Sequence, residues 1–159
     1  MKQILKELGL ASPTVTLLAF ALLAGCNQSD GKVYVPARGQ VLIGDKPAEG
    51  AAVTLVPAAS GESDELRPSG RVGADGAYTL TTYNPATGKV NDGAPPGEYV
   101  VLITMVPQPT EANLDRGVGD RLGDKYRDPS RSKLRAAIKA DAPDLAIIRL
   151  AATDLKIRK

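Results

Sequence analysis

Histidine, the side chain most often used for acid–base catalysis near neutral pH, is absent from this chain of 159 residues. A histidine general base, a Ser–His or Cys–His pair and a histidine-ligated zinc or iron site are therefore excluded. Cys26 is the only cysteine, so no disulfide can form within the chain. The remaining candidates for chemistry are hydroxyls, lysines and carboxylates, and their spacing decides which of them could act together.

Ser130 and Lys133 have the Ser-x-x-Lys spacing in which a buried lysine can activate a serine one helical turn away. Penicillin-binding enzymes use this spacing together with Ser-Asp-Asn and Lys-Thr-Gly motifs, and the chain has neither of these. Pro129 and the surrounding charges indicate a solvated loop instead. We therefore expect no catalytic residue here and no enzymatic activity.

A series of carboxylates lies in a charged segment late in the chain. Its members are Asp115, Asp120, Asp124 and Asp128. Calcium prefers such oxygen ligands, but cations such as Arg121 and Lys125 alternate with these acids, and the Asp-x-Asp-x-Asp-Gly pattern is missing. We expect salt bridges on a wet surface, with calcium binding as the alternative. The loop acids Glu62, Asp64 and Glu65 are expected to aid solubility, and we expect no metal or cofactor.

Aromatic side chains are scarce, and tryptophan is absent. A platform for stacking on sugars would depend on Tyr34 and Tyr83. Tyrosines of small β-sandwiches more often pack with the hydroxyl at the rim. Carbohydrate binding is therefore an alternative and not the main hypothesis.

The first residues carry the pattern of an export signal. Lys2 and Lys6 precede an apolar run from Thr14 to Ala24. This run is shorter than the roughly 20 residues that a membrane-spanning helix needs. A basic start followed by a short apolar run is typical of a cleaved secretory signal.

The end of this run resembles the lipobox of bacterial lipoproteins, whose cysteine is acylated and becomes the first mature residue. The matching residues are Leu23, Ala24, Gly25 and Cys26. We expect acylation at Cys26 and anchoring to a membrane of the cell envelope through the acyl chains. Asn27 is not an aspartate, which favours the outer membrane under the usual sorting rule.

The sequence divides into a signal peptide (1–25), a lipidated tether (26–36) and one domain (37–159). Short alternating apolar segments separated by turn signals predict about seven strands, and hence an all-β Greek-key sandwich. The very apolar segment from Glu98 to Val106 is expected to be a central strand. Segment 107–132 is expected to be a charged insertion with a short helix near 120–126. A hairpin formed by segments 134–139 and 145–150 is expected to close the domain.

Several motifs recur in a familiar order. Residues 39–57 read Gly-x-Val-x-Ile-x-Asp-x-Pro-x-x-Gly-Ala-x-Val-x-Leu-x-Pro, residues 75–80 read Asp-Gly-x-Tyr-x-Leu, and residues 96–101 read Pro-Gly-Glu-Tyr-x-Val. This order resembles the carboxypeptidase regulatory-like domain, a transthyretin-like (prealbumin-type) β-sandwich. The resemblance covers about 39–106, and 125–150 more loosely. It implies a non-catalytic module.

These observations predict a lipid-anchored, non-enzymatic protein with a structural or protein-interaction role. A partner strand could add to an exposed edge, either at Arg38 to Ile43 or at the C-terminal strand. The net charge of +2, without a concentrated basic face, argues against nucleic acid, and we expect no small-molecule ligand. The alternative is a carbohydrate- or calcium-binding module.

Overall fold

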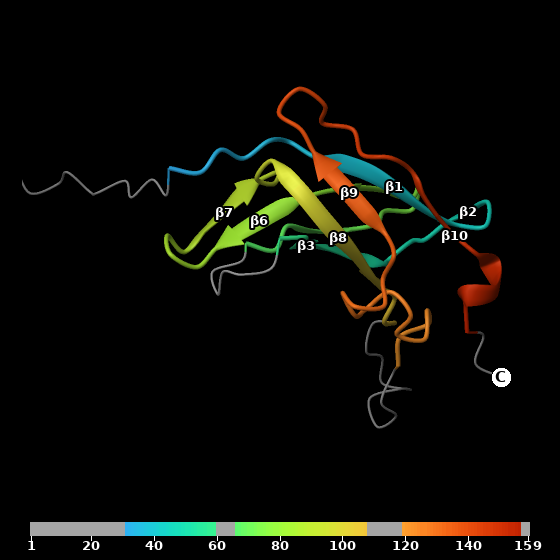
Figure 1. The fold of residues 1–159 in the computed structure, drawn as a ribbon. Helices are drawn as coiled ribbons and strands as arrows, with labels where there is room; N and C mark the ends of the chain where they lie inside the picture. The colour runs from blue at the N-terminus through green and yellow to red at the C-terminus, as the bar shows by residue number, and fades with distance from the viewer. Residues whose placement is uncertain (1–30, 60–65, 108–118, 157–159) are drawn as a thin grey trace, which may run out of the picture.

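The computed structural model describes residues 31–59, 66–107 and 119–156, which form an all-β fold of two sheets (Figure 1). The lipobox with Cys26, the acids of segment 62–65 and Asp115 lie outside the described residues. In the part of the chain that is described, no helix has the length and apolar character needed to cross a bilayer.

The larger sheet contains six strands in the order β7–β6–β4–β3–β8–β9. In chain order they are β3 (Ala52–Pro57), β4 (Ser69–Arg71), β6 (Thr81–Asn84), β7 (Lys89–Asp92), β8 (Gly97–Thr104) and β9 (Arg135–Ile138). β8 pairs with β3 on one side and with β9 on the other. The expectation that the segment after Glu98 forms a central strand is confirmed.

The smaller sheet is built around β1 (Arg38–Ile43). β10 (Ile148–Leu150) runs parallel to it along one edge. On its other edge, β1 pairs with two short antiparallel strands. β5 (Ala77–Thr79) pairs with the first half of β1, and β2 (Lys46–Pro47) pairs with its last two residues. A short 3-10 helix, η1 (Ala152–Asp154), follows β10.

Leu80 is the point at which the chain passes from one sheet to the other. It follows β5 of the smaller sheet and precedes β6 of the larger one. Its amide donates to the carbonyl of Ala37, and its own carbonyl accepts from the amide of Gly93. This crossing separates β5 from β6, and the described residues form ten strands in place of the seven that the sequence predicts.

The core between the sheets is aliphatic, and the inward positions predicted by alternation are confirmed. The motif positions all become buried: Val41, Val53, Tyr78, Leu80, Tyr99 and Val101. Val35, within the segment interpreted as tether, also lies in the core and forms a bridge with Ala94. Leu66, expected in an exposed loop, is buried too.

Two strand predictions are wrong. Arg38–Ile43 is not an edge strand, because β10 covers one side of it and β2 and β5 cover the other. Segments 134–139 and 145–150 do not form a hairpin with each other. β9 pairs with β8, whereas β10 crosses to the other sheet and pairs with β1. Alternation fixes which face of a strand is buried, but it does not choose the neighbouring strand.

The prediction of a short helix near 120–126 is also wrong, because turns are found there instead. The chain there forms a series of tight turns, with hydrogen bonds from Gly123 to Asp120 and from Lys125 to Leu122. Gly123 and Asp124 both have positive φ, of 66° and 59°. Two consecutive left-handed residues end any right-handed helix, so the four-residue apolar spacing is not helical here.

Candidate functional site

A groove with a cavity of about 500 Å³ lies between β9 and the chain leading into β10. β9 is the last strand of one sheet and β10 is the last strand of the other (Figure 1). The groove therefore lies where the two sheets end. Its apolar lining comes from both walls: Leu134, Ala136 and Ala137 on one, and Ala142, Leu145, Ala146, Ile147 and Ile148 on the other. We call this feature the β9–β10 groove.

Backbone pairing holds the β10 wall of the groove on β1. The amide of Arg38 donates to the carbonyl of Pro143, and the amide of Leu145 donates to the carbonyl of Arg38. The Arg38 guanidinium also donates to a carboxylate oxygen of Asp144. This hydrogen bond and the positive charge lower the pKa of Asp144. The segment that precedes β10 is therefore already bonded to β1 through Arg38.

The charges around the β9–β10 groove are mostly positive. Among the described residues that line it, Arg135, Lys139 and Arg149 are positive and Asp144 is negative. Asp144 is already paired with Arg38, while the Arg149 guanidinium lies 3.9 Å from its nearest carboxylate, Asp45. An apolar floor with cations at the rim suits a partner that presents apolar side chains together with carboxylates.

Tyr78 forms part of the wall of the β9–β10 groove. Its side chain is 3% exposed, and its hydroxyl has no hydrogen-bond partner among the described residues. Burial raises the pKa of this phenol to about 12. The ring lies across Gly39 on the paired strand, where an added Cβ would be 2.6 Å from the Tyr78 hydroxyl oxygen. Glycine at position 39 is thus what lets the ring lie flat over β1.

Ser130 and Lys133 do not form a catalytic pair. The Ser130 hydroxyl donates to Asp128 Oδ1 at 2.7 Å, and the Ser130 amide donates to the same oxygen at 2.8 Å. These bonds lower the pKa of Asp128. The neighbouring Ser132 is buried, and its hydroxyl donates to the carbonyl of Val101 at 2.6 Å. The serines of this segment hold turns and connect the loop to β8.

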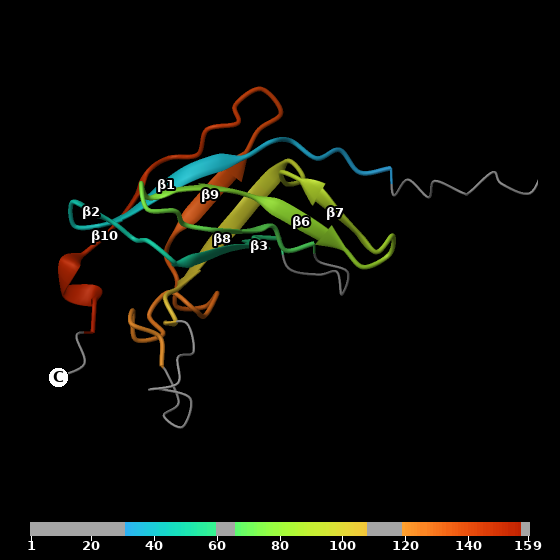
Figure 2. The same cartoon turned by 180° about the vertical axis from the view of Figure 1, so that it is seen from behind.

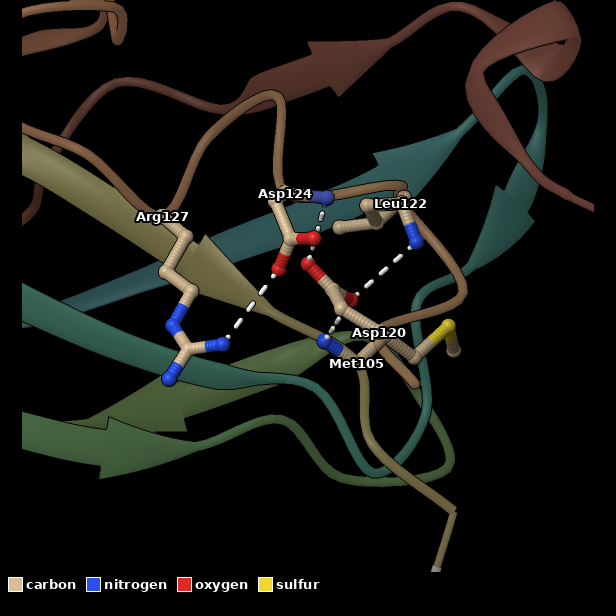
Figure 3. Close-up of polar contacts among 5 residues, drawn as sticks. All are labelled: Met105, Asp120, Leu122, Asp124 and Arg127. Carbon is tan, nitrogen blue, oxygen red and sulfur yellow. Dashed lines mark hydrogen bonds and ion pairs between the residues drawn. The ribbon is translucent and has the colours of Figure 1, made fainter. Parts of the chain in front are cut away.

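The carboxylate of Asp120 organises the same loop, as Figure 3 shows. Oδ1 accepts from the amides of Met105 at 2.7 Å and Leu122 at 3.1 Å, and Oδ2 accepts from the amide of Asp124 at 3.3 Å. Asp124 itself faces Arg127 at 3.4 Å. In the described ranges, no group of three or more acidic, histidine or cysteine side chains is placed to hold a metal ion. The oxygens of Asp120 are engaged with the backbone.

A polar cluster that the sequence analysis missed joins this loop to the C-terminal segment. Asp154 in η1 accepts from Lys125 Nζ and from the Tyr126 hydroxyl, both at 2.6 Å. The hydrogen bond from Lys125, and after it the hydrogen bond from Tyr126, lowers the pKa of Asp154. The amide of Lys156 adds a bond to the carbonyl of Arg121 at 2.7 Å. Because Asp154 lies far along the chain from Lys125, no local spacing could indicate this cluster.

The two tyrosines considered for sugar stacking do not form one platform. The Tyr34 hydroxyl accepts from Asn84 Nδ2 at 3.2 Å, and Asn84 is buried. Tyr83 is the preceding residue of β6 and is 57% exposed. Consecutive strand residues face opposite sides of a sheet, so the two rings are on different sides of β6.

No protein-family model, curated protein or solved structure matches this chain.

Proposed function

We propose that this chain is a lipid-anchored, non-catalytic protein of the bacterial cell envelope. The support is the succession of a basic start, a short apolar run and Leu23-Ala24-Gly25-Cys26. Acylation at Cys26 would attach the chain to a membrane, and each buried methylene contributes about 0.8 kcal/mol. Two or three acyl chains then anchor stably, whereas one chain does not.

We further propose that the domain is a Greek-key sandwich of the carboxypeptidase regulatory-like, transthyretin-like type. The motif positions Val41, Val53 and Val101 face the core, and Gly76 occupies a turn with a φ of 83°. The buried valines and the glycine turn support this proposal. The type itself implies a scaffold or interaction role.

The β9–β10 groove is the proposed site of that interaction. The observation that carries this proposal is its position between two sheet edges, with an apolar floor and cations at the rim. An extended partner segment can add to the outer edge of β10, place apolar side chains over Leu145 and Ile147, and present carboxylates to Lys139 and Arg149. The partner is therefore an extended peptide with alternating apolar and acidic residues.

Site-specific photocrosslinking in living cells tests this site. A photoreactive amino acid at Ile147, an exposed groove residue, should give one defined protein adduct. The same substitution at Val106, exposed outside the groove, is the matched control and should not give it. Lys139→Glu with Arg149→Glu should abolish the adduct. Equal crosslinking at both positions, or an adduct that survives the charge reversal, contradicts the proposal.

A further inference from the structure

The first described residues are fastened to one end of the sandwich. The amides of Val35 and Ala94 donate to each other's carbonyls at 2.9 Å, and Tyr34 is hydrogen-bonded to Asn84 of β6. Gly93 allows this contact, because a Cβ there would lie 2.0 Å from the Val35 carbonyl oxygen. In both views the described chain begins at the β6–β7 end, and β2 and η1 lie at the other end (Figures 1 and 2).

The distance between this end and the proposed anchor is short. Cys26 and Gly31 are five positions apart, so the chain between them spans at most about 18 Å even when fully extended. If Cys26 is acylated at the membrane surface, Gly31 must lie within that reach of it, and the β6–β7 end follows a few residues later. The domain cannot stand far from the bilayer.

The β6–β7 end also exposes apolar side chains. Tyr83 on β6 and Val90 on β7 are directly paired across the two strands, and they are 57% and 66% exposed. Val33, close to the start of the described chain, is 68% exposed. Tyrosine is enriched where proteins meet the bilayer interface, because its ring is apolar and its hydroxyl is polar.

The charges near the hairpin turn fit an anionic surface. Lys89 begins β7 and is exposed, and Lys32 is exposed beside Val33. Asp92 carries the opposite charge at the other end of β7. Lysines near a membrane are attracted to anionic headgroups, each strengthening binding by about fivefold. Lys89 pairs with Asn84 and so lies on the opposite face of the hairpin from Tyr83 and Val90. Its position beside the turn favours bringing the tip of the hairpin close to the lipid.

We propose that the outer face of the β6–β7 hairpin, with Tyr83 and Val90, rests on the phospholipid surface that holds the acyl chains. This inference rests on the proposed lipid anchor. It adds an orientation, in which the β6–β7 end faces the lipid and the β2 end points away from it.

Tryptophan fluorescence in the full-length protein tests this orientation. The natural chain has no tryptophan, so a single introduced one reports alone. Tyr83→Trp and Lys46→Trp place this probe at the β6–β7 end and at the exposed β2 end (Figure 2). Each acylated protein is reconstituted into vesicles of phosphatidylcholine and phosphatidylglycerol that contain brominated phosphatidylcholine.

Interfacial side chains lie roughly 5–10 Å into the headgroup region, so brominated lipid should quench Tyr83→Trp about threefold more than Lys46→Trp. A third probe, Ala86→Trp in the exposed hairpin turn, should lose quenching when Tyr83→Ser and Val90→Ser are added. Equal quenching of the two ends, or no effect of the serine substitutions, overturns the orientation.

Mass spectrometry of the same preparations separates this outcome from failure of the anchor. A chain that carries the acyl mass but shows equal quenching overturns the orientation alone. A chain without the acyl mass overturns the anchor, and with it the argument from reach.

Discussion

At the scale of single residues, several buried or half-buried polar groups of the described residues hold loops in place. The Ser132 hydroxyl donates a hydrogen bond to β8, and the carboxylate of Asp120 accepts hydrogen bonds from three backbone amides. Tyr78 differs, because its hydroxyl is buried without a partner among the described residues. An unpaired buried hydroxyl costs about 1–3 kcal/mol, so the hydroxyl of Tyr78 offsets part of the stability that its buried ring contributes.

Tyr78→Phe is therefore expected to stabilise the domain by about 1 kcal/mol, because the ring stays and the unpaired hydroxyl is removed. The matched control is Tyr126→Phe, which removes a hydroxyl bonded to Asp154 and should destabilise by a similar amount. Urea unfolding monitored by circular dichroism measures both. A loss of stability in Tyr78→Phe would mean that the hydroxyl has a partner.

The same residue gives an alkaline pH dependence. The folded pKa of Tyr78 is about 12, whereas the unfolded value is near 10. The folded state holds this proton more tightly than the unfolded state does. The stability that depends on the protonated phenol is therefore fully present below about pH 10 and is lost as the pH rises toward 12. Because burial also raises the pKa values of Tyr99 and Tyr126, both proteins lose stability at alkaline pH, but the natural protein should lose about 2–3 kcal/mol more than Tyr78→Phe. Equal alkaline profiles for the two proteins would contradict the assignment.

At the scale of elements, the turns of 120–131 act as a connector held by side chains and not as a helix. Asp120 joins them to the end of β8, and Lys125 and Tyr126 join them to η1 through Asp154. A loop with few apolar anchors gains its order from such bonds. Loss of one central acceptor should therefore loosen the whole connector.

Asp120→Ala is expected to destabilise the domain by about 1–3 kcal/mol, because it leaves three backbone amides without their acceptor. Asp124→Asn is the control, since it removes only an exposed ion pair with Arg127 and asparagine tolerates positive φ. Its effect should stay below about 0.5 kcal/mol. Thermal unfolding and amide exchange of Met105 and Leu122 measure the difference. Similar effects of both changes would show that Asp120 is not the organising residue.

At the scale of the whole molecule, two different surfaces have separate proposed tasks. The β6–β7 end, beside the first described residues, is expected to face lipid (Figure 2). The β9–β10 groove, where the two sheets end, is expected to receive a protein segment. A membrane-bound interaction module needs these two surfaces to be distinct, so that anchoring leaves the groove accessible.

Cys26→Ala is expected to move the full-length protein from the membrane fraction to the aqueous fraction, since the acyl chains supply the stable anchor. Intact-mass measurement of the natural protein should show acylation together with loss of residues 1–25. Cell fractionation and immunoblotting measure the shift. Asn27→Gln, which changes the neighbouring residue but keeps the cysteine, is the control and should stay with the membrane. Continued membrane retention of Cys26→Ala would contradict anchoring by acylation.

The fold class, the core-facing residues and several turns follow from local patterns in the sequence. Alternation predicted that Val53, Leu80 and Ile103 would be buried, because side chains on a strand alternate between two faces. Glycine and aspartate marked the turns at 44–45 and 74–76, because these residue types suit turn conformations. Local chemistry was sufficient for each of these features.

Which strands are neighbours depends on the packing of the whole domain and not on local patterns. The segments 134–139 and 145–150 have the pattern of a hairpin, yet β9 and β10 belong to different sheets. The β9–β10 groove, the Lys125–Asp154 bond and the unpaired Tyr78 hydroxyl all follow from that choice or from other long-range contacts. Residue spacing describes one strand or turn at a time, whereas strand order depends on how all the apolar faces are buried together.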